Sequence, residues 1–168
     1  MKYKLSKNAN ILFVGINPHP GSYDRGVPFS NNKMFWYLLS RSGFVEEDEE
    51  FLKNDVRLKH FYANEFVKKY KFNFINLVDR PTINVLQLKK GEESAGIKRF
   101  LKAVKIYRPK LICFIGKATY GKFSGTGKVN YGFKEPIHGI KVYVCRFPIR
   151  GPADERIKEL KRLKHAID

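Results

Sequence analysis

Acidic residues are scarce in this chain of 168 residues. Sixteen Asp and Glu stand against thirty-three Lys and Arg, which gives a formal net charge of +17. A surface with this charge repels cationic partners and attracts polyanions, so the composition favours a nucleic acid as the partner. A Lys-rich surface that serves only for solvation, as in the proteome of a thermophile, would explain the same charge. Charge alone does not distinguish RNA from DNA.

Cysteine is also scarce, with Cys113 and Cys145 as the two examples. Each lies in an apolar run that resembles a strand, so both are expected to be buried free thiols. Two cysteines this far apart do not form a zinc or iron–sulfur framework without further ligands. We therefore expect no metal and no cofactor. The low cysteine content also favours a cytoplasmic location.

Long hydrophobic runs are absent, and the longest, such as residues 111–116, are far too short to span a bilayer. The basic residues 1–10 are not followed by a long apolar stretch, so no signal peptide is expected and no membrane partner. Hydrophobic residues still make up 43% of the chain, which is too apolar for a disordered protein. The length and the lack of internal repeats predict a single domain over residues 1–168.

Apolar runs alternate with segments of helical periodicity. Four runs have the length and composition of buried strands, namely residues 9–15, 72–78, 110–116 and 140–146. Helices are predicted from a cap at Asn31 or Asn32 to near Gly43, and at residues 56–70, 92–107, 118–123 and 153–166. The Gly-rich residues 124–132 are expected to be a mobile loop. This alternation predicts an α/β fold in which helices cover both faces of a parallel sheet, with the chemistry at the carboxyl ends of the strands.

The loop after the first strand carries the first group of candidate residues. Gly15 and Pro18 shape a sharp exit from the strand, and Ile16 lies between Gly15 and Asn17. Asn17 can then direct its amide at a bound water or ligand, although Asn-Pro is also a common end to an ordinary strand. Further along the same loop, Phe29 belongs either to the core or to a platform on which a base stacks.

Asn76 lies near the end of the second strand, where Val or Ile would be expected. A buried amide must find partners, and this one offers an acceptor and two donors. That pattern complements the O4 and N3–H edge of uracil. An amide that hydrogen-bonds the backbone of the neighbouring loop would satisfy the same requirement, and the sequence leaves both interpretations open.

The loop before the last helix is rigid and has an unusual tip. It contains Phe147, Pro148, Ile149, Arg150 and Gly151. An apolar or cationic tip can enter the space that a flipped base leaves in a duplex. The helix that follows offers backbone N–H groups to a phosphate. A plain strand-to-helix connection is the alternative interpretation.

Taken together, these segments resemble one family. The resemblance rests on residues 13–18 (FVGINP), 28–29 (PF), 35–36 (FW), 77–82 (LVDRPT) and 115–118 (IGKA), in this order. The chain resembles the mismatch-specific uracil-DNA glycosylases, which are related to the thymine-DNA glycosylases within the uracil-DNA glycosylase superfamily. The similarity extends from about residue 11 to about residue 162. It implies a three-layer α/β/α sandwich with a central four-stranded parallel sheet, and it assigns water positioning to Asn17 and base stacking to Phe29.

Three positions depart from the pattern of the mismatch-specific enzymes. His19 replaces the last Gly of their GINPG motif, where it can contact the substrate or face solvent. Asn76 matches the residue with which the broader superfamily recognises uracil. In the last loop the family has Asn-Pro-Ser-Gly and the wider superfamily His-Pro-Ser, so only Pro148 is shared. The polar group that stabilises the leaving base is therefore absent, and the cysteine count excludes the iron–sulfur branch.

These observations predict a monofunctional glycosylase that flips uracil out of double-stranded DNA containing uracil or a mismatch, and acts as a monomer. Asn17 would position the attacking water, while Asn76 and backbone N–H groups near Ile16 and Phe29 would hold the base. A catalytically weak or inactive nucleic-acid binder on the same scaffold is the alternative. A nucleoside enzyme acting on small molecules fits the charge poorly.

Contacts with the DNA backbone are assigned to the last helix. Arg156 and Lys158 are expected to bind phosphates without recognising sequence, and Ile149 or Arg150 to fill the gap left by the flipped base.

Overall fold

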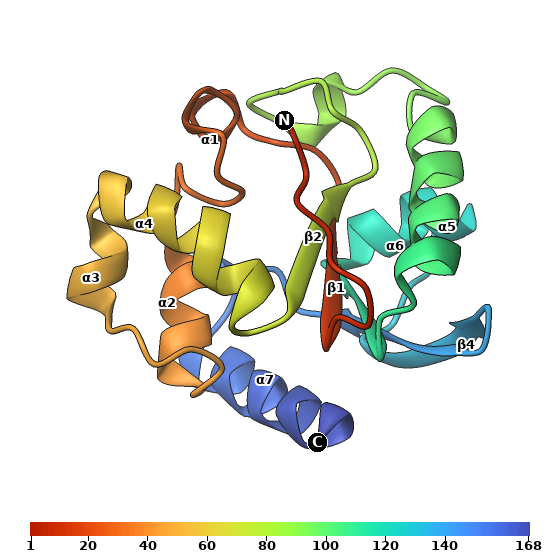
Figure 1. Ribbon diagram of the computed structural model, residues 1–168. Helices are drawn as coiled ribbons and strands as arrows, with labels where there is room; N and C mark the ends of the chain where they lie inside the picture. The colour runs from red at the N-terminus through yellow and green to blue at the C-terminus, as the bar shows by residue number, and fades with distance from the viewer.

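A five-stranded sheet forms the centre of the molecule, whose computed structural model describes residues 1–168 (Figure 1). The strands are β1 (Ile11–Gly15), β2 (Phe72–Asn76), β3 (Leu111–Ile115), β4 (Gly132–Ile137) and β5 (Ile140–Cys145). Their order across the sheet is β2-β1-β3-β5-β4. The first four in that order are parallel to one another, and β4 pairs antiparallel with β5 at the edge.

Helices cover both faces of the sheet, which confirms the predicted three-layer α/β/α architecture. They are α1 (Pro20–Arg25), α2 (Met34–Arg41), α3 (Glu49–Lys53), α4 (Asp55–Phe61), α5 (Ser94–Tyr107), α6 (Lys117–Ser124) and α7 (Ala153–Ile167). One core lies between the sheet and α2, α4 and α7, and a smaller one between the sheet and α5. Figure 1 shows α2, α3, α4 and α7 on one side of β1 and β2, and α5 and α6 on the other. No helix combines the length and apolarity that a membrane crossing requires.

The central strands form where the sequence is apolar at every position. All residues of β1, β2 and β3 are buried, as expected for parallel strands that are covered on both faces. Alternate side chains enter opposite cores, so Phe13 packs under α2 while Leu12 and Val14 pack under α5. This alternation places Gly15 and Asn76 on the α2 side of the sheet, at its carboxyl edge.

The sequence predicted four strands, and the fifth strand, β4, was not among them. Its side chains are mostly exposed and it includes Pro136, so it lacks the apolar run that marked the others. Pro is tolerated at a sheet edge because the missing N–H faces away from the ladder. The register of its pairing with β5 shifts between Lys134 and Ile137.

Two predicted segments are subdivided in the structure. The expected helix at residues 56–70 is α4 followed by a π-helical turn, η1 (Tyr62–Phe66), and the expected loop at residues 79–90 contains a short 3₁₀ turn, η2 (Val85–Gln87). The loop after β1 contains α1, which ends at Gly26 in the left-handed conformation with φ of 69°.

Candidate active site

The loops after β1 and β2 run side by side at the carboxyl edge of the sheet. The parallel pairing of the strands continues beyond them, because Val78 N donates to Ile16 O over 2.8 Å and Thr82 N donates to Pro18 O over 3.1 Å. The two loops are thereby held in register. This arrangement brings Asn17, Asn76 and the segment around Thr82 to one place.

Asn17 is fixed by its amide nitrogen. Asn17 Nδ2 donates to Thr82 Oγ1 over 2.8 Å and to the carbonyl oxygen of Arg80 over 3.0 Å. Both partners accept hydrogen bonds from the nitrogen, so the amide oxygen points away from them. No protein donor contacts Asn17 Oδ1. The side chain therefore presents a fixed acceptor that a water molecule can occupy.

Asn76 is the last residue of β2, and only 3% of its surface is exposed. It pairs in register with Gly15, where a Cβ atom would lie 2.5 Å from Asn76 Oδ1. A side chain at position 15 would therefore displace the Asn76 amide from its present place. The side-chain amide makes no hydrogen bond within the protein, so it does not bind the neighbouring loop. Both polar atoms of the amide still reach solvent, so they are available to a ligand with a complementary edge.

The backbone of Asn76 is held by a network that the sequence did not predict. Arg99 on α5 donates to the carbonyl oxygen of Asn76 over 2.7 Å and to Asp79 Oδ2 over 2.7 Å. Tyr3 donates its hydroxyl to Asp79 Oδ1 over 2.5 Å, and burial raises the pKa of Tyr3, so it remains a donor. A Cβ at Gly96 would lie 1.5 Å from Leu77 O, so the glycine lets α5 approach β2. In the sequence, a hint of this network is that Gly96 and Arg99 are three residues apart, which places both on the same face of α5.

Phe29 lies in a group of aromatic rings beside this amide. It has a φ of 55°, which is unusual for a side chain other than Gly, Asn or Asp. Its ring stacks on Phe35 with centroids 4.8 Å apart and meets Phe74 edge-on at 5.6 Å. Phe147 from the last loop lies 6.2 Å away. Phe29 is therefore packed against the larger core while remaining partly exposed.

The last loop has the predicted apolar tip. Pro148 is buried, whereas Ile149 is 52% exposed and Arg150 is exposed next to it. Phe147 packs over Gly116, where a Cβ would lie 3.5 Å from the ring. Phe147 follows β5 on the same face of the sheet as Gly15 and Asn76. An apolar ring therefore stands where the related enzymes have the polar side chain that stabilises the leaving base.

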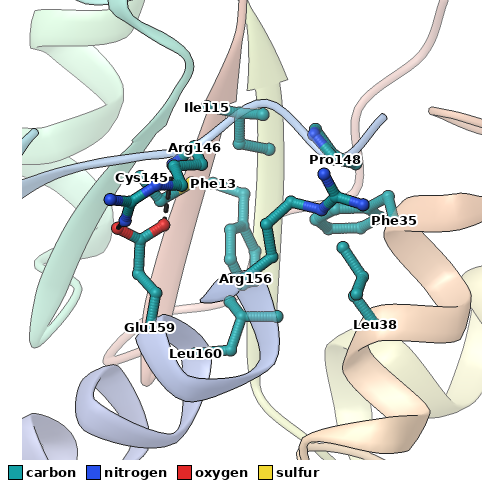
Figure 2. A pocket seen from close by; sticks show the side chains of 10 residues that line it. All are labelled: Phe13, Phe35, Leu38, Ile115, Cys145, Arg146, Pro148, Arg156, Glu159 and Leu160. Atoms are coloured by element: carbon teal, nitrogen blue, oxygen red, sulfur yellow. Dashed lines mark hydrogen bonds and ion pairs between the residues drawn. The ribbon is translucent and has the colours of Figure 1, made fainter. Parts of the chain in front are cut away.

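Arg156 does not lie on the surface, whereas the sequence analysis assigned it to phosphate binding. It is 5% exposed, and its Nη1 donates to the carbonyl oxygens of Arg150 and Gly151. These carbonyls point inward, so a donor must reach them from the core side. Figure 2 shows the Arg156 side chain directed between Pro148 and Phe35. Arg156 therefore holds the loop in place, and Lys158 remains exposed.

A small cavity adjoins Arg156, with a volume of about 20 Å³ (Figure 2). This is room for about one water molecule and far too little for a nucleobase. Arg156 Nε is buried beside it without a hydrogen-bond partner. Neither Asn17 nor Asn76 lines this cavity, so it is separate from the carboxyl ends of β1 and β2 where they lie.

Two cations are stacked on one ring beside the last loop. Lys117 Nζ lies 4.4 Å and the Arg146 guanidinium 4.9 Å from the ring centroid of Tyr131. Arg146 is also bound by Glu159, which is 2% exposed and accepts from its Nη1 over 3.0 Å. Because Glu159 and Glu155 both pair with Arg146, Lys117 is the one of these two cations without an acidic partner. Neither residue was singled out as a phosphate contact in the sequence.

His19 caps α1. Its Nδ1 accepts from Gly21 N over 3.1 Å, which fixes the tautomer with the proton on Nε2. The ring is partly exposed. No group of three or more His, Cys, Asp or Glu lies close enough to hold a metal ion, and Cys113 and Cys145 are buried free thiols.

A comparison with protein families identifies the family of the chain. A model described as the uracil DNA glycosylase superfamily matches residues 3–161, which is nearly the whole chain. The match includes both loops of the carboxyl edge and all of the sheet. The chain therefore belongs to the uracil DNA glycosylase superfamily, whose members are DNA glycosylases.

Proposed function

We propose that the protein excises uracil from double-stranded DNA and belongs to the mismatch-specific branch of its superfamily. The choice of uracil is carried by the amide of Asn76, which belongs to a buried residue, lies beside Gly15 and has no partner within the protein. The branch rests instead on the motifs at residues 13–18, 28–29 and 77–82, because Asn76 itself departs from the mismatch-specific pattern. Its nitrogen can donate to O4 of uracil and its oxygen can accept from N3–H. Cytosine offers the reverse pattern, which the amide matches only after turning over, so the orientation with Oδ1 beside Gly15 favours uracil.

The reaction uses water as the nucleophile. The bond between C1′ and the base nitrogen lengthens first, which leaves positive charge on the sugar and negative charge on the base. A water molecule that donates a hydrogen bond to Asn17 Oδ1 then forms the new bond to C1′ and releases its second proton to solvent. No carboxylate is present in residues 16–18, so general-base catalysis is weak and the rate is modest.

The negative charge that develops on the leaving base is stabilised by hydrogen-bond donors. Asn76 Nδ2 donates to O4, and backbone N–H groups near Ile16 and Phe29 complete the set of donors. Phe29 is partly exposed and supplies an apolar surface against which the base stacks, while Phe74 supports its ring from the core. Phe147 adds no hydrogen bond, so the developing charge on the base is less stabilised than a polar side chain at that position would allow.

The monomer would hold the duplex by its backbone. Ile149 and Arg150 fill the gap left by the flipped nucleotide, while Lys117 and Lys158 contact phosphates. Flipping costs a few kcal/mol and least in a mispair, so G·U pairs are the best substrates.

One observation favours a second candidate function. Phe147 occupies the side of the site from which a polar group is missing, as in a DNA-binding protein that has lost its activity. Incubation with labelled duplex that contains one G·U pair, followed by alkaline cleavage at abasic sites, separates the two. Strand cleavage that requires uracil supports the glycosylase, and tight binding without cleavage supports the inactive binder. A matched G·C duplex is the control.

A further inference from the structure

Two large apolar side chains stand in solvent at the carboxyl edge, in the turn that follows β2. Ile83 is 76% exposed and Leu86 is 87% exposed, more than the Ile149 tip of the last loop. Figure 1 shows this segment, which includes η2, arching over the carboxyl ends of β1 and β2 near α1. Exposed side chains of this size at a functional edge are typical of a contact surface.

The turn is held rigidly by its own polar groups. Asn84 and Gln87 form a capping box around η2, and Gln87 Oε1 also accepts from Ile83 N over 3.0 Å. Arg80 donates to the carbonyl oxygen of Gln87 over 2.9 Å and binds Glu92 through two hydrogen bonds of 2.6 and 2.9 Å. The apolar side chains are thus fixed outward by the geometry of the turn, and their exposure is not a consequence of a loose loop.

The charge around the turn suits a polyanion. Of its acidic neighbours, Glu92 pairs with Arg80 and Asp79 pairs with Arg99, while Glu93 makes no ion pair. Lys89 and Lys90 follow the turn and make no ion pair. The local surface is therefore apolar at its tip and positive at its base. This combination is typical of elements that place an apolar side chain into a groove of DNA between phosphate contacts.

The turn also stands opposite the last loop. It follows β2, and the loop with Ile149 follows β5, which lies three strand positions away in the order β2-β1-β3-β5. With strands about 4.8 Å apart, the two strand ends are separated by about 14 Å, or about four nucleotide steps of 3.4 Å. Gly15 and Asn17 lie between them.

We propose that the turn at residues 82–88 is a second DNA-contacting element, whose Ile83 and Leu86 side chains pack into the duplex on the side of the flipped nucleotide opposite Ile149. The proposal rests on the proposed function, because it takes duplex DNA as the partner. Ile83 adjoins Thr82, which binds the amide of Asn17. Contact at the tip would therefore also hold the water-positioning side chain in place when a duplex is bound.

The test compares duplex and single-stranded DNA that carry the same uracil. The variant Ile83→Ser/Leu86→Ser removes both apolar side chains, and Ile106→Ser removes an exposed isoleucine from α5 at the opposite, amino edge of the sheet. We expect single-turnover excision from the duplex to fall about tenfold in the double variant and excision from the single strand to stay unchanged. Ile83→Val/Leu86→Met should retain most of the duplex rate, and Ile106→Ser all of it.

Three results would overturn the proposal. An equal loss on both substrates would mean that the substitutions act through Thr82 and Asn17, and an unchanged duplex rate would mean that the tip touches no DNA. A change in oligomeric state, measured by light scattering, would assign the tip to a second copy of the chain. If the wild type excises uracil from neither substrate, the proposed function fails while the inference stays testable. Equilibrium binding to an abasic duplex analogue and to the single strand should then show the loss of duplex preference in the double variant.

Discussion

Asn17 Nδ2 donates a hydrogen bond of 2.8 Å to Thr82 Oγ1, which lies 65 residues further along the chain. This bond joins the loops after β1 and β2 and decides which end of the amide faces the substrate. With the nitrogen held by Thr82 and by the carbonyl of Arg80, the oxygen is left as the acceptor for water. The catalytic property of Asn17 therefore depends on a residue outside its own motif.

Removal of the Asn17 amide should abolish turnover and leave DNA binding intact. Asn17→Ala is expected to lower the single-turnover rate by about 100-fold or more, as for the loss of one positioning group. Thr82→Val keeps the amide but removes its main acceptor, so a smaller loss of about tenfold is expected. Quench-flow excision and equilibrium binding on the same duplex provide the two measurements. An Asn17→Ala variant of normal activity would disprove the assignment.

The identity of the excised base should depend on Asn76. Asn76→Ala removes the group that distinguishes edges, so the ratio of uracil to hypoxanthine excision should fall along with the overall rate. Asn76→Asp cannot donate to O4, and each unmatched group costs about 1–3 kcal/mol. Phe29→Ala is the matched control, because stacking does not depend on the edge pattern and should slow all bases alike. An unchanged base ratio in Asn76→Ala would make Asn76 a structural residue.

The sequence predicted the centre of the fold because the central strands are apolar throughout. Residues 72–78 and 110–116 have the length and composition of strands buried on both faces, and β2 and β3 lie there. The edge strand β4 escaped prediction because its stability comes from pairing with β5 and not from its own composition. The local sequence pattern of β4 does not show that β5 will pair with it.

The candidate site was predictable in position but not in its contacts. Asn76 ends β2 and Asn17 follows the end of the neighbouring parallel strand β1, so their proximity follows from topology. That Asn76 lacks a partner required the structure. Arg156 was assigned to the surface because arginine in the first turn of a helix is usually exposed. It is buried because two carbonyls of the preceding loop turn inward, and no sequence pattern records the direction of a carbonyl.

Arg156 should contribute to the stability of the fold. Arg156→Leu keeps the apolar packing and leaves the carbonyls of Arg150 and Gly151 without their donor, at a cost of about 2–4 kcal/mol in the free energy of unfolding. Lys158→Ala, two residues further along α7 and exposed, should change it by about 0.5 kcal/mol or less. Urea denaturation of both variants provides the comparison. Equal stability of Arg156→Leu and wild type would exclude a structural role for the guanidinium.

Alkaline stability should depend on Tyr143. Burial, together with the charge of Glu159, raises the pKa of Tyr143 to about 12 from a usual value of about 10. Because the folded pKa is raised, this contribution to stability is complete below about pH 10 and is lost as the pH rises toward 12. Tyr143→Phe should therefore flatten the fall in the free energy of unfolding across that range. The same slope in wild type and Tyr143→Phe would assign the effect to other groups.

The last prediction concerns the positive charge. If about four to six phosphates are contacted, the logarithm of the binding constant should fall against the logarithm of salt concentration with a slope of about −4 to −5. Lys117→Ala should make this slope shallower by about one, because Lys117 is held on Tyr131 at the functional edge without a compensating acid. Lys110→Ala is the matched control, because Lys110 is exposed at the start of β3, on the opposite edge of the sheet. The binding should also be nearly independent of the sequence around the damaged base, since phosphates carry no sequence information.

Fluorescence anisotropy at several salt concentrations gives each slope. A flat response in the wild type would mean that the excess of Lys and Arg only solvates the surface, and equal effects of the two variants would mean that DNA has no preferred face.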